Sequence, residues 1–401
     1  MLNGKTVVLG VCGSIAAYKT ADLASALKKL GADVHVIMTK NATNIINPIA
    51  FESLTGNKCM VDTFDRNFQF NIAHISIAQK ADVCLIAPAS ANVIGKIANG
   101  IADDMLTTTV MAMNCRVMIS PAMNVNMIHN KIVQDNLSRL ENFGYEIIPP
   151  ESGYLACGTV GDGKMPSKEV LLEYILREVE HEKDLKGFKV LVTAGPTRED
   201  IDPVRYITNH STGRMGYAIA GAAMKRGANV TLVSGPVELK KPLFIDSVDI
   251  KSAEDMFEVV SKRADENDII IKAAAVADYT PSKVAENKIK KSDGNMSIEL
   301  NRTKDILKWL GEHKRENQVI CGFSMETENV IENSRAKLLK KNADMIAANS
   351  LREKNAGFGT DTNHIVLIEK DRTTDIPMMS KEEAANKLLD RILQLIKNKQ
   401  S

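Results

Sequence analysis

Short β-branched runs and longer amphipathic segments alternate along this chain, and the alternation starts anew near its middle. In the first half, the apolar runs at 6–9 and 34–38 predict strands, and residues 15–30 between them repeat apolar positions at helical spacing. A glycine loop joins the first strand to this helix. A strand, a helix and a second parallel strand form one βαβ unit, so this stretch predicts the start of an α/β sheet.

The second start lies within residues 189–216, around which the rest of the chain is organised. An apolar run at 190–193 breaks at Gly195-Pro196, helical spacing returns over 215–226, and a further strand is predicted at 230–233. The two units read almost alike where the helix ends, ALKKLGADVHVIM against AAMKRGANVTLVS. Shared βαβ geometry explains such a likeness, so it supports two α/β domains without proving a duplication.

A polar joint separates the two predicted sheets. Residues 168–182 predict a charged amphipathic helix, and the sequence HEKDLKG that starts at His181 offers few apolar anchors. We place the boundary near residue 186, which gives domains at 1–186 and 187–401. The fold class is α/β with three layers in each domain, because helices cover both faces of a parallel sheet.

Composition and net charge limit the kinds of molecule that this protein is expected to bind. The chain has 401 residues, 44% of them hydrophobic and 25% charged, with a net charge of +1, which gives no electrostatic footprint for nucleic acid or a membrane surface. Small-molecule partners are therefore favoured. The six cysteines form no CxxC pair and no secretory or membrane-spanning segment is evident, so we expect a cytoplasmic protein with reduced thiols.

Three loops follow predicted strands of the first half. Gly13 and Ser14 follow the first strand and precede a helix, a position where backbone amides bind phosphate. No GxGxxG fingerprint occurs and the second strand ends at Thr39 rather than an acidic residue, which disfavours a dinucleotide and leaves a mononucleotide open. The loops PASAN (88–92) and PAMNVNM (121–127) end two further strands with small polar residues, where open α/β sheets bind ligands.

Two residues of the first half carry groups suited to proton transfer. His74 precedes the third strand, and by itself it fits a structural histidine as well as a catalyst. Cys157 lies among the glycines of residues 153–166, a composition typical of a flap that closes over a site. A cysteine there can donate a proton, although an inert thiol in a loop is the alternative.

The set GSIAAYK, AHIS, PASAN, ADDMLTT, PAMN and LACG…GDGKMP resembles the flavin-dependent phosphopantothenoylcysteine decarboxylases of coenzyme A biosynthesis over residues 1 to about 180. The resemblance implies a flavodoxin-like domain that binds FMN and forms trimers with the flavin near a subunit interface. It implies that His74 and Asn124 lie at the substrate, with Asn124 holding the carboxylate that is lost, and that Cys157 is the proton donor. It places these residues around FMN: Gly13, Ser14, Thr39, Ser90 and Asn92.

The second half resembles the phosphopantothenate–cysteine ligases, the usual fusion partner of that family. The matching segments are AGPTREDIDPVRYITNHSTGRMG, KAAAVADY, ENKIKK, GFSMET and the helix with Lys337 and Lys341, and no Walker A motif occurs. The resemblance implies a Rossmann-like domain that uses CTP and Mg²⁺, with no metal ligand assigned, and places Asn209 and Lys288 near an acyl-cytidylate. It assigns to the CTP site Lys272, Ala273, Ala274, Asp278, Lys288, Lys304, Asp305, Ile306, Leu307, Phe323, Lys337 and Lys341.

Together these features predict a bifunctional enzyme that condenses 4′-phosphopantothenate with cysteine and decarboxylates the product to 4′-phosphopantetheine. Amide synthesis needs an activated carboxylate and cations for the phosphates, which Arg205 and the lysines of the second half supply. A homo-oligomer built of trimeric decarboxylase and dimeric ligase units, up to a dodecamer, is expected. The alternatives are a flavin decarboxylase of another cysteine-terminated substrate and a non-catalytic flavin- or nucleotide-binding regulatory subunit.

Overall fold

The computed structural model describes residues 2–64, 73–154, 158, 160–290, 296–326, 328–350, 357 and 359–400. It divides into two compact units, Met1–His181 and Glu182–Ser401. The division falls five residues before the boundary expected near 186, because Leu185 is buried in the core of the second unit and its N–H donates to Arg226 C=O. The polar joint therefore belongs to the second unit.

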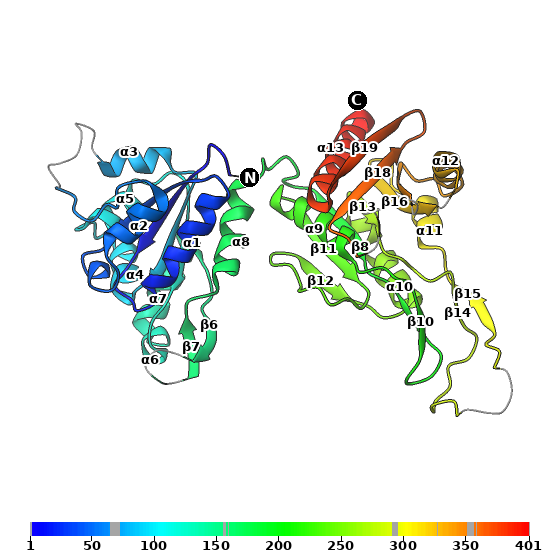
Figure 1. Ribbon diagram of the computed structural model, residues 1–401, viewed down its shortest axis with the longest axis horizontal. Coiled ribbons are helices and arrows are strands. Elements are labelled where there is room, and N and C mark those ends of the chain that lie inside the picture. The colour runs from blue at the N-terminus through cyan, green and yellow to red at the C-terminus, as the bar shows by residue number, and fades with distance from the viewer. Residues whose placement is uncertain are drawn as a thin grey trace. The chain divides into compact units, whose positions relative to one another are not determined.

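The first unit, coloured from blue to green in Figure 1, contains a five-stranded parallel sheet of order β2-β1-β3-β4-β5. This order matches the flavodoxin-like arrangement. In that arrangement the ligand site lies between β1 and β3, where the order of the strands along the sheet reverses. The strands are β1 Thr6–Val11, β2 Asp33–Met38, β3 Val83–Ala89, β4 Arg116–Pro121 and β5 Glu146–Ile147. Residues 6–9 and 34–38 are strands as the apolar pattern predicted.

Helices cover both faces of this sheet, because alternate strand residues point to opposite sides. Val7 and Leu9 pack in a core with α1 and α8, whereas Val8 packs in a second core with α4, α5 and α7. The helices are α1 Ala17–Lys29, η1 Ala42–Asn44, α2 Pro48–Thr55, α3 Ala73–Lys80, α4 Ala91–Ala98, α5 Met105–Met111, α6 Val125–Ile128, α7 Lys131–Asn142 and α8 Lys168–Val179. A separate antiparallel hairpin consists of β6 Glu151–Tyr154 and β7 Val160–Lys164.

The second unit contains an eight-stranded sheet of order β12-β11-β8-β13-β16-β17-β18-β19. Its first six strands are parallel and follow the Rossmann order, and the last two add an antiparallel hairpin that the apolar pattern did not predict. The strands are β8 Lys189–Ala194, β11 Asn229–Ser234, β12 Asp246–Asp249, β13 Ile269–Lys272, β16 Val319–Glu326, β17 Met345–Ser350, β18 Thr362–Ile368 and β19 Thr373–Ser380.

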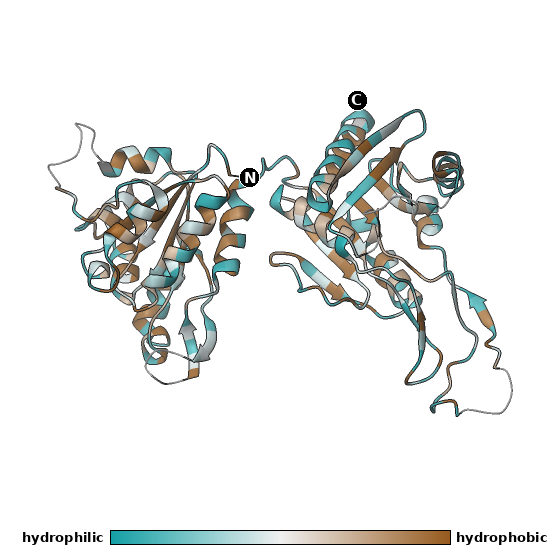
Figure 2. Cartoon of the chain, in the orientation of Figure 1, coloured by the Kyte–Doolittle hydropathy of each residue, from teal (hydrophilic) through white to brown (hydrophobic). Residues whose placement is uncertain are grey.

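This sheet is also the middle of three layers. Val190 and Val192 face a core shared with α9 and α13, and Leu191 faces a core shared with α10, α11 and α12. The helices are α9 Arg214–Lys225, α10 Ala253–Arg263, η2 Ala264–Glu266, α11 Ile306–Glu312, α12 Val330–Lys340 and α13 Lys381–Gln400. Figure 2 shows that the strands of both sheets carry mainly hydrophobic residues, as sheets buried on both faces do.

Two short ladders stand apart from the second sheet. The polar loop expected after Pro196 contains an antiparallel pair, β9 Arg198–Asp200 and β10 Tyr206–Thr208. A second pair, β14 Tyr279–Pro281 and β15 Leu300–Arg302, projects from the body of this unit (Figure 1). Among the helices that the structure describes, none combines the length and apolar content required to cross a bilayer.

Candidate functional sites

The first candidate site lies at the carboxyl edge of the five-stranded sheet. Ser14, in the loop after β1, and Asn124, after β4, line one pocket of about 470 Å³ together with Tyr18, Lys19 and Lys164. Lys164, which stands where the resembling family commonly has arginine, thus provides a cation at this pocket. The two loops come from strands separated by β3, and their meeting here follows from the strand order.

The start of α1 suits a phosphate group. Its N-cap Ala16 makes no side-chain hydrogen bond to the first turn, and that turn holds no acidic residue, so no side chain neutralises the positive end of the helix dipole. The Ser14 and Ala17 N–H groups already donate to Cys12 O and Ser14 O. Gly13 allows a close approach, since a Cβ there would lie 2.7 Å from Asn41 Cβ. The Ser14 hydroxyl group and the positive end of the helix dipole fit the phosphate and ribityl chain of FMN.

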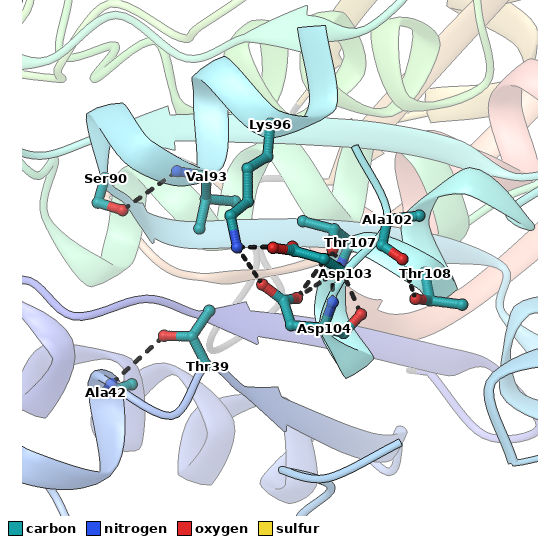
Figure 3. A network of polar contacts seen from close by, with 10 residues as sticks. All are labelled: Thr39, Ala42, Ser90, Val93, Lys96, Ala102, Asp103, Asp104, Thr107 and Thr108. Carbon is teal, nitrogen blue, oxygen red and sulfur yellow. Dashed lines mark hydrogen bonds and ion pairs between the residues drawn. The ribbon is translucent and has the colours of Figure 1, made fainter. Parts of the chain in front are cut away.

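Thr39 and Ser90 lie at the same edge of the sheet, at the ends of β2 and β3. Thr39 Oγ1 accepts from Ala42 N–H at 3.3 Å and Ser90 Oγ accepts from Val93 N–H at 3.4 Å, so each hydroxyl oxygen caps a helical turn (Figure 3). Asn92 is exposed in the first turn of α4. These three residues are not among the described residues that line the pocket of Asn124.

An ion-paired cluster supports this edge. Figure 3 shows Lys96 reaching from α4 to Asp103 and Asp104, with Nζ–Oδ distances of 2.6 and 3.1 Å. Burial alone would raise the pKa of Asp104, but hydrogen bonds from Thr107 and Lys96 outweigh it and lower that pKa. Asp104 also caps α5 in a capping box with Thr107. The ion pair between Lys96 of α4 and Asp104 at the start of α5 therefore fixes these two helices against each other, and α4 begins directly after Ser90.

The β6–β7 hairpin lies against the loop of Asn124. Met123 N–H donates to Gly163 C=O at 3.1 Å, and a Cβ on Gly163 would lie 2.3 Å from Met123 O, so only glycine permits this approach. Asn124 caps α6, and its Oδ1 accepts from Asn126 N–H at 2.9 Å. The hairpin that leads to the cysteine segment thus contacts the residues on either side of Asn124.

Neither His74 nor Cys157, both predicted from the sequence to act at this site, is among the described residues that line its pocket. His74 lies half-buried in the first turn of α3 and is not among the described residues that line the Asn124 pocket. Cys157 lies outside the described residues. The other cysteine near this edge, Cys12, is buried, and burial raises the pKa of its thiol to about 12, so it is no candidate for proton transfer.

The second candidate site lies between β8 and β13, where the Rossmann order reverses. Ala274 N–H donates to Thr193 Oγ1, Ala275 N–H donates to Gly195 O at 2.9 Å, and Ala277 N–H donates to Thr197 Oγ1 at 3.0 Å. These bonds fasten the loop after β13 to the loop after β8. Asn209 joins them, because its Nδ2 donates to Ala275 O at 2.9 Å.

A pocket of about 380 Å³ opens over this fastened loop. Asn209, the amino-terminal turn of α9 and Phe323 line it, together with Ala273 and Ala274. Gly216 lets α9 approach the sheet, since a Cβ there would lie 2.6 Å from Ala194 Cβ. The backbone of α9 and the strand ends can therefore both reach a ligand, as in other sites at the switch point of such sheets.

Another pocket of the second unit, of about 440 Å³, adjoins the 380 Å³ pocket, because Lys272, Asp278 and Lys337 line both. It gathers most of the residues that the resemblance assigns to CTP: Lys272, Asp278, Lys304, Asp305, Ile306, Leu307, Lys337 and Lys341. These residues come from the end of β13 and the loop after it, from residues 304–307 at the start of α11, and from the end of α12, so three separate stretches of sequence converge on one cavity. Arg302 and Tyr279, at the start of the projecting ladder, complete its wall.

Clustered lysines give the 440 Å³ pocket its positive charge. Burial, and after it the neighbouring charge of Lys337, lowers the pKa of Lys272 to about 8, and burial also lowers the pKa of Lys337. Lys341 forms an ion pair with Asp305, and Lys304 forms one with Glu254. Crowded and partly desolvated ammonium groups favour a polyanion such as a triphosphate, which would relieve their mutual repulsion.

The other two cations expected at the phosphates lie elsewhere. Lys288 is exposed in the segment between β14 and β15, and it is not among the described residues that line either pocket. Arg205 was expected to neutralise phosphate, but its guanidinium is engaged by Asp202, with Nε and Nη2 at 2.9 and 2.6 Å from Oδ2. Arg205 therefore has a structural partner in the same loop.

The sequence analysis did not identify two asparagines that line the 380 Å³ pocket of the second unit. Asn349, near the end of β17, and Asn363, on β18, are 6% and 1% exposed, and their Oδ1 atoms have no hydrogen-bond partner among the described residues. Asn349 could have been found from the sequence, because polar residues end the apolar run MIAANS, just as the small polar residues of PASAN end a predicted strand in the first half. Asn363 could not be found in this way, because it follows a loop and belongs to the unpredicted hairpin.

Comparisons with known proteins decide the family. The Flavoprotein model matches residues 1–180, and the model of the DNA/pantothenate metabolism flavoprotein C-terminal domain matches residues 185–396. The chain is 47% identical over 401 residues to the Coenzyme A biosynthesis bifunctional protein CoaBC of Bacillus subtilis, which covers 99% of this chain and 98% of that protein. The chain belongs to this family of bifunctional coenzyme A biosynthesis proteins.

A second relative agrees with this assignment. The protein of the same name from Escherichia coli is 40% identical over 395 residues, covering 98% of this chain and 97% of that one. A crystal structure of the C-terminal domain of a bifunctional protein with this name is 44% identical and covers 53% of this chain and 98% of that chain, with a TM-score of 0.46. Members of the family are both phosphopantothenoylcysteine decarboxylases and phosphopantothenate–cysteine ligases, and the flavoprotein domain binds FMN.

Proposed function

We propose that the second unit condenses 4′-phosphopantothenate with cysteine at the expense of CTP, and that the first unit decarboxylates the product to 4′-phosphopantetheine. The observation that carries this proposal is the pair of adjoining pockets in the second unit, one lined by Lys272, Lys337 and Lys341 and the other by Asn209. A triphosphate in the lysine pocket would place its α-phosphate toward the Asn209 pocket, across the wall that both share.

The ligase step then divides into two displacements. The carboxylate oxygen of phosphopantothenate attacks the α-phosphorus of CTP, the bond to the β-phosphate oxygen breaks, and pyrophosphate leaves. Mg²⁺, when bound, would neutralise phosphate charge. The amine of cysteine next attacks the acyl carbon of the resulting acyl-cytidylate, and CMP leaves as the amide forms. The lysines neutralise the leaving pyrophosphate, and Asn209 stabilises the acyl-cytidylate. Lys288 is not one of the described residues that line either pocket, so its proposed contact with the acyl-cytidylate requires its long side chain to reach in from the segment after β14.

The decarboxylase step takes place in the Asn124 pocket of the first unit. FMN, when bound, would supply the two-electron oxidation of the thiol-bearing carbon of the substrate and, after CO₂ is lost, the matching two-electron reduction. Asn124 orients the carboxylate that leaves as CO₂, and Cys157 donates the last proton. The β6–β7 hairpin, whose strands flank the Cys157 segment in the sequence, is hydrogen-bonded beside Asn124 through Met123 and Gly163.

We also propose that several copies of the chain assemble around the first site. His74 and Asn124 are both expected at the substrate, yet His74 on α3 is not among the described residues that line the Asn124 pocket. A neighbouring copy that supplied His74 would reconcile the two, in keeping with the trimeric decarboxylase units expected from the sequence. The dimeric ligase units and the dodecamer remain predictions.

The route of activation can be tested with hydroxylamine in place of cysteine. An acyl-cytidylate is trapped as a hydroxamate with release of CMP and pyrophosphate in equal amounts. An acyl phosphate would instead release CDP and inorganic phosphate, and that result would contradict the proposed route. Substitution of ATP for CTP in the same assay measures the nucleotide preference.

A further inference from the structure

The search outside the pockets leads to a buried carboxylate in the loop between β9 and β10. Asp202 has a side chain with no exposed surface, and two backbone amides of its own loop, those of Val204 and Arg205, donate to its Oδ1 at 2.8 Å each. The Arg205 guanidinium donates to Oδ2 through Nε and Nη2. Burial alone would raise the pKa of Asp202, but these hydrogen bonds lower it well below the usual range.

The same carboxylate reaches a segment more than eighty residues further along the chain. Ile289 N–H donates to Asp202 Oδ2 at 3.1 Å, and Arg205 Nη2 donates to Ile289 C=O at 2.7 Å. Both backbone polar groups of Ile289 are therefore held by one ion pair. A third bond, from Ala285 N–H to Ile201 O at 3.0 Å, fastens the segment a few residues earlier.

These contacts surround Lys288, which directly precedes Ile289. Lys288 is exposed and lies in the segment that leads away from the projecting β14, so its own side chain does little to fix the backbone. The loop of Asp202 continues through β10 to Asn209, which is hydrogen-bonded to Ala275 O. One carboxylate thus connects the two residues that the proposed function places at the acyl-cytidylate.

We propose that Asp202, with Arg205, is a positioning residue that holds the Lys288 segment in the geometry required for condensation. This inference rests on the proposed ligase role of Lys288. Asp202 acts through the backbone of Ile289 and touches neither substrate nor nucleotide. A carboxylate is required because Oδ1 accepts from two loop amides while Oδ2 accepts from Ile289 N–H and the Arg205 guanidinium. An asparagine would turn one of these two acceptor oxygens into an NH₂ donor and would remove the charge that pairs with Arg205.

The test is the kinetics of Asp202→Asn in the full-length enzyme loaded with FMN. A misplacement of about an ångström in a catalytic group lowers turnover by up to about a hundredfold, so we expect kcat of CTP-dependent condensation to fall tenfold or more. The KM for CTP should stay within about twofold, because the lysine pocket does not contact Asp202. Decarboxylation of supplied phosphopantothenoylcysteine should be unchanged.

The matched control is Asp200→Asn on the same hairpin. Asp200 pairs with Lys251 and does not contact Ile289, so this variant should retain wild-type condensation. A double-variant cycle with Lys288→Gln separates positioning from general damage. If Asp202 acts only through Lys288, Asp202→Asn should lower kcat no further in the Lys288→Gln background.

Two results overturn the inference: wild-type kcat in Asp202→Asn, or independent losses that multiply in the double variant. Should Asp202→Asn fail to fold, Arg205→Lys carries the same test, because lysine keeps the charge but cannot bond Asp202 and Ile289 O as a planar fork does. A wild-type rate in Lys288→Gln alone would instead contradict the proposed role of Lys288, a different failure that the same cycle detects.

Discussion

Replacement of Lys272 by methionine tests the lysine pocket most closely. Lys272 ends β13 and lines both pockets of the second unit, and burial beside Lys337 lowers its pKa from 10.5 to about 8. A fall of this size corresponds to about 3 kcal/mol of unfavourable interaction for the charged form at pH 7, as an upper estimate. Without ligand, the charged form of Lys272 therefore carries a desolvation cost and a smaller repulsion from Lys337, and methionine removes both.

The effect on stability has a definite sign. Between pH 8 and 10.5 the unfolded chain binds a proton that the folded chain does not, so the stability of the wild type rises over this window. Lys272→Met should be more stable than the wild type at pH 7, by a Tm increase of several degrees at about 2–4 °C per kcal/mol, and the advantage should shrink as the pH rises to 10. Differential scanning calorimetry of the ligand-free proteins measures this.

The effect on activity has the opposite sign. Loss of one charge-assisted contact to the triphosphate costs about 2.7–4 kcal/mol, so kcat/KM for CTP should fall about a hundredfold to a thousandfold, measured by pyrophosphate release. In the wild type, CTP affinity should weaken as the pH rises above about 8, and this dependence should be smaller in the variant, where only the other lysines of the pocket titrate. Lys308→Met, on the exposed face of α11 beside Glu312, is the matched control.

A variant that binds CTP as well as the wild type would refute this account of the pocket. So would equal pH dependence in the two proteins, because another group would then be responsible. A variant less stable than the wild type at pH 7 would show that Lys272 is not under electrostatic strain in the folded enzyme.

Three further predictions concern the two halves separately. The purified protein should be yellow and release FMN on denaturation, and release of FAD in the chromatographic assay would contradict the single-phosphate loop at Gly13. Cys157→Ser should release CO₂ but stall before the final protonation, with flavin left reduced under anaerobic conditions; normal 4′-phosphopantetheine formation in mass spectra would remove Cys157 from the mechanism. Lys288→Gln should lose CTP-dependent condensation by a hundredfold or more yet decarboxylate supplied phosphopantothenoylcysteine at the wild-type rate. Parallel loss of both activities, with FMN content intact, would mean that the sites are coupled.

Much of the fold could be predicted because apolar periodicity is local. The strands and helices of both βαβ starts form where spacing placed them, and Asn47-Pro48 starts α2 with the Asn47 side chain as its cap. The β18–β19 hairpin and the β9–β10 pair could not be predicted in this way. Short strands of mixed polarity, such as Tyr206–Thr208, depend on partners that lie elsewhere in the chain.

The same distinction between local pattern and distant contacts decides which site residues could be predicted from the sequence. Residues at the ends of apolar strands, such as Ser14 and Asn124, could be named from sequence because the carboxyl edge of a parallel sheet is one place in space. Arg205 could not, since its charge fits a phosphate or a carboxylate equally well, and only the fold shows that Asp202 lies beside it. Whether a lysine faces solvent or a crowded pocket is likewise set by distant elements, as Lys288 and Lys272 show.

The central claim is that one chain performs both reactions in sequence. The most direct measurement supplies the FMN-loaded enzyme with 4′-phosphopantothenate, cysteine, CTP and Mg²⁺ and follows the products by mass spectrometry. We predict that 4′-phosphopantetheine accumulates, with one CO₂, one CMP and one pyrophosphate for each molecule formed. Accumulation of phosphopantothenoylcysteine without CO₂, or consumption of CTP without amide formation, would contradict it.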